Sequence, residues 1–266
     1  MNLKSDENII LPYEIMKQID TTSGKEVHIG KSKSRVFRYR GKNNHFYYLK
    51  ISNLESIKKE ILHEVQVINW LSQKNINTAK VKSVVSTDAQ LFFLMSEIPG
   101  ESLAQLASKI YPKECMRIGA SFLKTLHSID INQCPFNQKL KVMKKRALQN
   151  IENNVVDKSD FDLENRGKSI AHLFSEIDWD LKEDLVFTHG DFCFPNIICQ
   201  NGEVNGVVDL GRAGLADRYQ DIALFLRSFK TNVGEPDINA FLQHYELIDK
   251  IDAVKISLFK KIDEFF

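Results

Sequence analysis

The segment from 185 to 212, LVFTHGDFCFPNIICQNGEVNGVVDLGR, carries three polar side chains at a defined spacing. Asp191 ends the triplet HGD, Asn196 follows five residues later, and Asp209 begins the triplet DLG. Carboxylate and amide oxygens are the hard ligands that Mg²⁺ requires, and a carboxylate can orient an attacking hydroxyl and accept its proton. We therefore predict a phosphoryl-transfer site with Asp191 as the base, Asn196 as a metal ligand and Asp209 as the principal metal ligand.

The same spacing occurs in protein kinases, where an asparagine lies five residues after the catalytic aspartate and Asp-Phe-Gly follows. In this chain DLG takes the place of the last motif. The alternative interpretation is an ordinary strand pair with polar turn residues. A three-part match at the correct spacing is much harder to reach by chance than one motif, so we favour the kinase-like interpretation.

These side chains must be positioned by strands. The apolar run 185–187 predicts a buried strand, and the runs 197–198 and 207–208 are separated by two Asn-Gly pairs, which is typical of a hairpin. Such a hairpin brings Asn196 and Asp209 to its open end, next to Asp191.

The N-terminal part alternates between strand patterns and one long helix. Residues 1–20 predict a short helix or cap with Pro12 near its start, and Lys50 lies near the end of the third strand. Strands are predicted at 26–29, 36–40, 46–51, 81–85 and 91–95, and an amphipathic helix at 56–72. Glu64 lies on that helix, and a strand lysine paired with a helix glutamate is the kinase arrangement for binding nucleotide phosphates. The alternative for Glu64 is a solvent-facing acid.

The loop 30–34 joins the first two strands and offers one glycine and two serines, including Ser32, instead of the G-x-G-x-x-G of protein kinases. Its backbone amides and a hydroxyl are suited to phosphate oxygens. A solvated hairpin turn is the alternative.

Residues 96–100 predict a linker between two lobes, whose backbone would meet the edge of an adenine ring. Met95 is either a core side chain or a wall of that pocket. Beyond the linker the pattern becomes mainly helical, so the fold class is α+β. Helices are predicted at 102–110, 112–128, 138–151, 167–177, 217–230, 237–245 and 251–266. His127 is interpreted as a packed residue at a helix end, and 138–151 as a solvated basic face.

Two acidic stretches are suited to binding a cationic ligand. The run 157–164, DKSDFDLE, is either a negatively charged wall or the acid-rich start of a helix. The helical spacing of the last residues predicts that the C-terminus packs down, which would gather Asp263, Glu264 and the terminal carboxylate of Phe266. Clustered acids are costly unless a cation meets them. A surface helix end is the alternative.

Composition narrows the possibilities further. The 266 residues suffice for one large domain or two lobes, and the net charge of +1 gives no support for a nucleic-acid or membrane-surface partner. The apolar runs are too short to span a bilayer, and the N-terminus lacks a signal-peptide pattern. The four cysteines lack metal-site spacing, which indicates reduced thiols, a cytoplasmic location and no structural metal.

With these residues identified, the chain resembles the aminoglycoside 3'-phosphotransferases, or kanamycin kinases, over nearly its whole length. The motifs that carry the resemblance are YYLK at 47–50, HEVQVINWL at 63–71, LMSE at 94–97, LHSIDINQCP at 126–135, LVFTHGDFCFPNI at 185–197, VVDLGRAGLADRYQDIA at 207–223 and DEFF at 263–266. The resemblance implies a bilobal protein-kinase-like fold. We expect a small N-terminal antiparallel β lobe with one main helix (residues 1–97) and a larger, mainly helical C-terminal lobe (98–266).

The resemblance also implies a role for each site residue. Bound ATP would contact Ser32 and Lys50 through its phosphates, stack on Tyr48 and meet the backbone of Ser96 and Ile98, with Glu64 holding Lys50. Asp191 would be the base, and Asn196 and Asp209 would bind Mg²⁺. The aminoglycoside pocket would be lined by Asp160, Asp162, Glu164, Arg212, Arg227, Asp263, Glu264 and the Phe266 carboxylate. Phe194 replaces an acid that some members carry, as in members with Cys-Leu-Pro-Asn.

The leading hypothesis is ATP-dependent phosphorylation of the 3'-hydroxyl of aminoglycosides such as kanamycin and neomycin, which confers resistance, by a monomer or weak dimer. The second is a kinase of another small alcohol of the choline, macrolide or amino-sugar type; a choline site would need an aromatic cage that the sequence does not reveal. The third is a non-catalytic nucleotide-binding module, which retention of Lys50, Asp191, Asn196 and Asp209 disfavours. A protein substrate is disfavoured because the segment after DLG is short.

Overall fold

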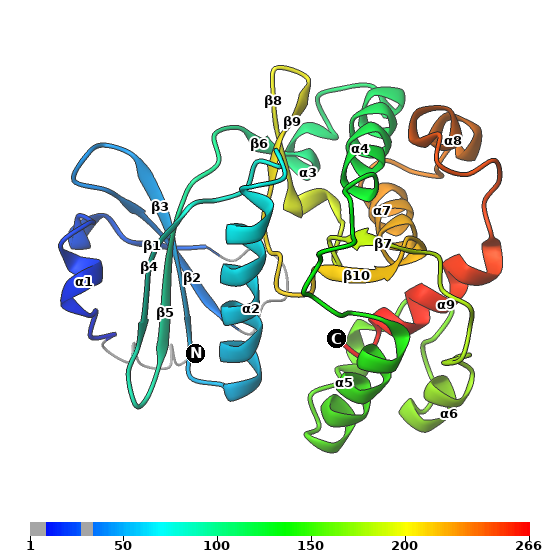
Figure 1. The fold of residues 1–266 in the computed structure, drawn as a ribbon, viewed down its shortest axis with the longest axis horizontal. Helices are drawn as coiled ribbons and strands as arrows, with labels where there is room; N and C mark the ends of the chain where they lie inside the picture. The colour runs from blue at the N-terminus through cyan, green and yellow to red at the C-terminus, as the bar shows by residue number, and fades with distance from the viewer. Residues whose placement is uncertain (1–8, 28–33) are drawn as a thin grey trace, which may run out of the picture.

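The computed structural model describes residues 9–27 and 34–266, in which an antiparallel sheet and a mainly helical part lie on either side of one long helix (Figure 1). The strands of the sheet are β1 (Lys25–Glu26), β2 (Arg35–Arg40), β3 (Phe46–Ser52), β4 (Val81–Ser86) and β5 (Leu91–Ser96). The helices are α1 (Tyr13–Met16), α2 (Glu55–Leu71), α3 (Leu103–Leu106), α4 (Pro112–His127), α5 (Leu140–Glu152), α6 (Ile170–Ser175), α7 (Tyr219–Asn232), α8 (Ile238–Tyr245) and α9 (Ala253–Asp263). Within the described ranges, none of the helices combines the length and apolar character that a membrane crossing needs.

The five-stranded sheet has the order β1-β2-β3-β5-β4. Its first three strands form the predicted meander, and β5 lies between β3 and the edge strand β4. Its side chains alternate between two apolar clusters because successive residues of a strand face opposite sides. On β5, Phe92 and Leu94 face α1, whereas Phe93 and Met95 join the large core that includes α2. Met95 is therefore a buried core side chain.

The same alternation positions the predicted nucleotide residues on β3. Tyr47, Leu49 and Ile51 pack into the cluster with α1. Tyr48 and Lys50 consequently face the other side, toward α2 and the helical part. The sheet ends at Ser96, one residue before the predicted lobe boundary at 97/98, which stays a prediction.

The hairpin predicted from the two Asn-Gly pairs is formed by β8 (Ile197–Gln200) and β9 (Glu203–Val207). Asn201 and Gly202 make its two-residue turn with φ of 55° and 80°, the left-handed values that such turns need. Ile197 pairs with Val207, so Asn196 and Asp209 lie at the open end of the hairpin. A third strand, β6 (Glu101–Ser102), pairs with β8 and joins the end of the linker to this hairpin.

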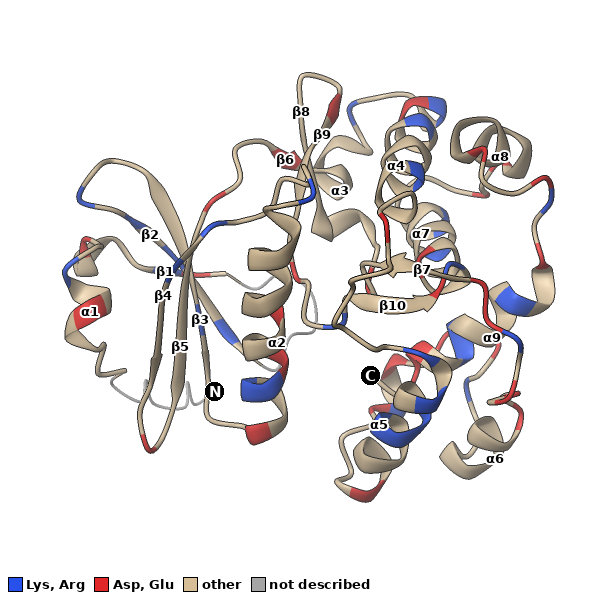
Figure 2. Cartoon of the chain, in the orientation of Figure 1, with Lys and Arg blue, Asp and Glu red and all other residues tan. Residues whose placement is uncertain are grey.

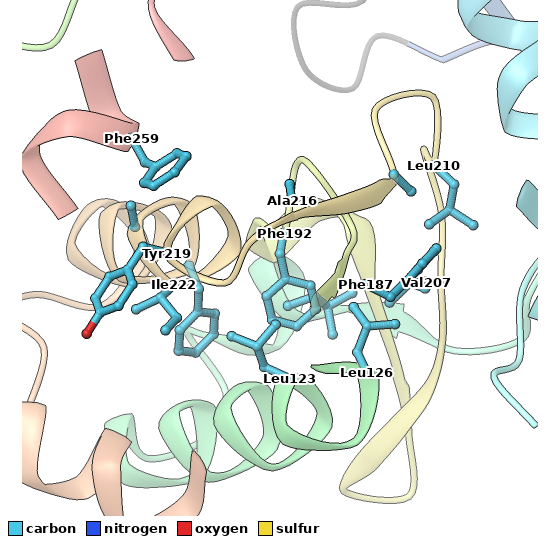
Figure 3. Close-up of a cluster of buried hydrophobic side chains, with 14 of the residues drawn as sticks. Leu123, Leu126, Phe187, Phe192, Val207, Leu210, Ala216, Tyr219, Ile222 and Phe259 are labelled. Carbon is cyan, nitrogen blue, oxygen red and sulfur yellow. The ribbon is translucent and has the colours of Figure 1, made fainter. Parts of the chain in front are cut away.

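The core of the helical part forms around the predicted central strand, β7 (Leu185–Thr188). Figure 3 shows Leu123 and Leu126 of α4, Phe187 of β7 and Ile222 of α7 in one apolar cluster. This packing fixes the segment between β7 and α7, which contains the predicted site.

Several predicted boundaries were wrong for local reasons. Residues 214–217 form strand β10 (Gly214–Asp217) against β7, and α7 begins only at Tyr219. The predicted helix 102–110 ends at Leu106, and α4 starts at Pro112, whose ring drives the preceding residue, Tyr111, to extended backbone. The predicted helix 167–177 is confined to α6, which Ser169 caps.

The hairpin also contacts the N-terminal part. Val207 N donates to Asn77 O at 3.2 Å, and a parallel bridge pairs Thr78 with Val207. Asn205 Nδ2 donates to Pro99 O of the linker at 2.7 Å. The hairpin that carries the predicted metal ligands is thus bonded both to the linker and to the loop before β4.

Candidate active site

Lys50 joins the sheet, α2 and the hairpin through its ammonium group. Lys50 Nζ lies 2.7 Å from Glu64 Oε2 and 2.9 Å from Asp209 Oδ1. Burial opposes the charged lysine, but the carboxylates of Asp209 and Glu64 outweigh it and raise the pKa of Lys50. Since an ammonium has three N–H donors, one remains for a phosphate oxygen. The structure therefore brings these three predicted residues together and leaves Glu64 buried rather than solvent-facing.

Asp191 and Asn196 form the second contact of the site. Asn196 Nδ2 donates to Asp191 Oδ2 at 3.0 Å and to Asp191 O at 3.0 Å. The amide nitrogen is thereby committed to the predicted base, which leaves the amide oxygen as a possible metal ligand. Burial raises the pKa of Asp191, opposed by Arg212 and reinforced by Asp263 and Asp209.

The HGD triplet is held by its own backbone and by His189. His189 Nε2 lies 2.9 Å from Val208 O, and Asp191 N donates to His189 Nδ1 at 3.3 Å. The proton therefore resides on Nε2. Gly190 has φ of +85°, and a Cβ added there would lie 2.1 Å from Arg212 O, so this position requires glycine. The His189 ring therefore connects Asp191, the predicted base, to Val208, the residue before Asp209.

Beneath this triplet lies a fully buried carboxylate, Asp221 of α7. His189 N donates to Asp221 Oδ2 at 2.7 Å, and Gly190 N donates to Asp221 Oδ1 at 2.8 Å. His127 Nε2 lies 3.1 Å from the same carboxylate, and His127 Nδ1 lies 2.7 Å from Tyr245 Oη. Burial lowers the pKa of His127, which accords with a packed rather than catalytic histidine.

The predicted nucleotide residues that the structure describes lie on β3 and on the linker. Tyr48 is half-buried, and its hydroxyl lies 3.5 Å from Glu97 Oε1. Ser96 N donates to Lys80 O at 2.9 Å, and Ile98 is buried next to it. Ser32 lies outside the described residues, as does most of the loop 30–34.

The predicted acceptor wall is an ion-pair cluster. Arg212 Nη2 donates to Asp263 Oδ1 at 2.5 Å, and Arg227 donates to the other oxygen of Asp263. Burial opposes ionisation of Asp263, but the two arginines lower its pKa. For Asp263, the cationic partner that the sequence predicted is thus supplied by Arg212 and Arg227. Arg212, Asp263 and Phe266 share a small pocket between α5, α7 and α9.

The acidic run meets the C-terminus through Glu264. Glu264 Oε1 accepts hydrogen bonds from Asp162 N at 2.9 Å and Asn165 Nδ2 at 2.8 Å. Asp162 also lies 3.6 Å from Arg227. Asp160 and Glu164 are exposed on the same loop. Glu264 therefore holds this loop in place, which its spacing in the sequence did not indicate.

The C-terminus packs down through Phe265, as predicted, and Phe265→Ala tests its importance. The Phe265 ring is fully buried edge-on against Phe174, and Asn150 Nδ2 donates to Phe265 O at 2.7 Å. We expect Phe265→Ala to cost about 3–5 kcal/mol of unfolding free energy, measured by urea denaturation. Phe266→Ala is the matched control, since this residue is 36% exposed, and we expect a smaller loss. Equal losses would contradict anchoring by Phe265.

The donor set fits a magnesium ion that is shared with a nucleotide. Asn196 offers its amide oxygen, and Asp209 has one carboxylate oxygen beyond the one on Lys50. Within the described part of the chain, no three His, Cys, Asp or Glu side chains group as a metal site. Mg²⁺ is commonly held by one or two carboxylates together with substrate phosphates, so two protein ligands suffice.

Several residues that shape the site escaped the sequence reasoning. Arg146 was placed on a solvated helix face, but burial lowers its pKa and it lines the pocket beside Arg212. Asp221 accepts hydrogen bonds from the HGD backbone, whereas Arg227 on the same helix pairs with Asp263 and Asp162. The signal available for Asp221 is its place in the motif RYQDIA, and for His189 its position in HGD.

Comparison with known proteins places the chain among phosphotransferases. The profile of the Phosphotransferase enzyme family (APH) matches residues 23–255. The aminoglycoside 3'-phosphotransferase of Niallia circulans is 31% identical over 257 residues, 95% of each chain. That of Acinetobacter baumannii is 30% identical over 264 residues, 96% of this chain and 98% of the relative.

Solved structures give the same result for the fold. The aminoglycoside-3'-phosphotransferase of type VIII superposes with a TM-score of 0.79 at 26% identity, covering 92% of this chain and 94% of its own. The aminoglycoside phosphotransferase APH(3'')-Id of Streptomyces rimosus has a TM-score of 0.80 at 22% identity, covering 91% and 92%. These likenesses confirm the predicted α+β, protein-kinase-like fold. By sequence, by fold and by the residues gathered at the hairpin, this chain belongs to the phosphotransferase enzyme family that contains the aminoglycoside 3'-phosphotransferases.

Proposed function

We propose that this enzyme transfers the γ-phosphoryl group of ATP to the 3'-hydroxyl of aminoglycosides such as kanamycin and neomycin, and so confers resistance to them. The observation that carries the proposal is the convergence of three contacts around the open end of one hairpin. Lys50 meets Glu64 and Asp209 there, and Asn196 meets Asp191. The relatives named aminoglycoside 3'-phosphotransferases support the acceptor. A neighbour in fold, APH(3'')-Id, was solved in complex with ADP and streptomycin, which supports the nucleotide.

In this mechanism the chain supplies position and charge rather than covalent chemistry. Asp191 orients the acceptor hydroxyl and takes its proton, while Asn196 fixes the carboxylate by donating to Oδ2. Lys50 donates its remaining N–H to the nucleotide phosphates. Asn196 and Asp209 would hold Mg²⁺, which neutralises phosphate charge when bound.

The acceptor would bind against the loop 157–164 and the C-terminus. Aminoglycosides are polycations, so carboxylates that remain exposed attract them. Asp160 and Glu164 are exposed on the loop, and the ring of Phe266, which carries the terminal carboxylate, lies 5.2 Å from the guanidinium of Arg212. Figure 2 shows Asp and Glu near the C-terminus facing Lys and Arg along α5. This mixture of signs accords with recognition by a few placed acids instead of a uniformly negative surface.

The first experiment measures ADP release with Mg-ATP and compares kanamycin with tobramycin, which lacks the 3'-hydroxyl. We expect turnover with kanamycin alone. Turnover with both would move the target hydroxyl elsewhere, and turnover with neither would discard this acceptor and lead to a panel of small alcohols. Phosphorylated kanamycin would be checked by mass spectrometry.

A further inference from the structure

One face of α2 contacts the backbone of residues 210–213, directly after Asp209. Glu64 Oε1 accepts a hydrogen bond from Leu210 N at 3.4 Å. One turn earlier on the helix, Glu60 covers Gly211 so closely that a Cβ added there would lie 2.6 Å from Glu60 Cγ. Helix positions three and four residues apart lie on one face. A third side chain on this face, His63, extends the contact to Ala213.

His63 makes the shortest of these contacts. His63 Nε2 lies 2.7 Å from Ala213 O, and the side-chain nitrogen of Gln138 lies 3.5 Å from the same oxygen. A nitrogen that close to a carbonyl oxygen must donate, so the imidazole carries its proton on Nε2. Burial lowers the pKa of His63, which keeps the ring neutral near pH 7. The ring also packs edge-on against Phe136, with centroids 5.2 Å apart.

The backbone that His63 holds is itself fixed to the helical part. Ala213 N donates to Leu210 O at 3.1 Å, and Leu215 N donates to Phe136 O at 2.7 Å. A parallel bridge pairs Asn137 with Leu215. His63 therefore connects α2 to a rigid backbone segment, not to a loose loop.

We propose that His63 is a positioning residue for phosphoryl transfer, which clamps α2 to the segment after Asp209 and keeps the Lys50–Glu64 pair in register with Asp209. Glu64 is the next residue along α2, so a shift of the helix moves its carboxylate and with it the ammonium of Lys50. The 3.4 Å contact from Leu210 N is too long to hold that register as tightly as the 2.7 Å contact of His63. This inference rests on the proposed use of Lys50 and Asp209 to bind Mg-ATP.

The test compares His63→Ala with His63→Gln in steady-state assays in which Mg-ATP and kanamycin are varied separately. We expect kcat/KM for Mg-ATP to fall about 2- to 10-fold in His63→Ala, the loss typical of one hydrogen bond, with the KM for kanamycin unchanged. His63→Gln, whose amide Nε2 reaches a similar position, should recover most of the loss. Gln66→Ala, on the exposed side of the same helix, should match the wild type.

Calorimetry of Mg-ATP binding to the three variants and the wild type tests the role of His63 independently of the proposed acceptor. Weaker nucleotide binding in His63→Ala, recovered in His63→Gln, supports the clamp even if kanamycin is not turned over. Unchanged binding and unchanged kinetics overturn it. A loss of active enzyme with both KM values unchanged also overturns it, since a purely structural role would give that result. Failure of the wild type to bind Mg-ATP overturns it as well.

Discussion

Asp191→Asn is expected to lower kcat by about 10²- to 10⁴-fold, the usual contribution of a positioned general base. The amide keeps the size of the carboxylate but cannot accept the proton of the acceptor hydroxyl. The contact with Asn196 Nδ2, which now lies at 3.0 Å, can persist through the amide oxygen. The hairpin and the Lys50 contacts should therefore be retained. The measurement is ADP release at saturating Mg-ATP and kanamycin.

The control for this prediction is Asp88→Asn, which makes the same charge change in the exposed turn between β4 and β5. It should leave kcat unaltered. Thermal melting of the Asp191 variant should stay within a few degrees of the wild type. Near-normal turnover by Asp191→Asn would remove Asp191 from the mechanism, whatever the state of the rest of the site.

Asp221→Ala is expected to destabilise the protein strongly. The carboxylate is fully buried and accepts from His189 N, Gly190 N and the ring of His127. Alanine leaves those donors without a partner in a site that water does not reach, which typically costs about 3–5 kcal/mol. Because two of the donors belong to the HGD backbone, activity should be lost together with stability. Urea denaturation followed by fluorescence measures the unfolding free energy.

Asp237→Ala is the control against which this loss of unfolding free energy is compared. Asp237 caps α8 by accepting from Ala240 N at 3.1 Å, and it is exposed. Loss of such a cap typically costs about 1 kcal/mol. If Asp221→Ala cost no more than Asp237→Ala, the buried carboxylate would not be what holds the HGD triplet.

The part of the site that the sequence predicted best follows from local rules. Strand alternation puts Lys50 on the side opposite Leu49 and Ile51, and an Asn-Gly turn closes a hairpin in one register. Those two rules place Lys50 on the inner side of its sheet and bring Asn196 close to Asp209, but the approach of Lys50 to Asp209 depends on how the sheet packs against the hairpin. The resemblance to a family then assigned their roles.

The part that was not predicted depends on contacts between distant segments. Whether Asp263 faces a substrate or Arg227 is decided by how α9 packs on α7, and no spacing in either helix encodes that choice. Arg146 stands among lysines in a basic helix, so its burial depends on the rotation of α5 against its neighbours. Strand β10 has no strand-like pattern and exists because β7 offers an unpaired edge beside it.

The double attachment of the hairpin restrains the N-terminal part against the helical part. The N-terminal part is joined to it at the linker, through Pro99, and again at the loop before β4, through Val207. A third attachment, from α2 to residues 210–213, follows Asp209 in the chain, so a relative motion of the two parts would have to break contacts at the predicted site itself.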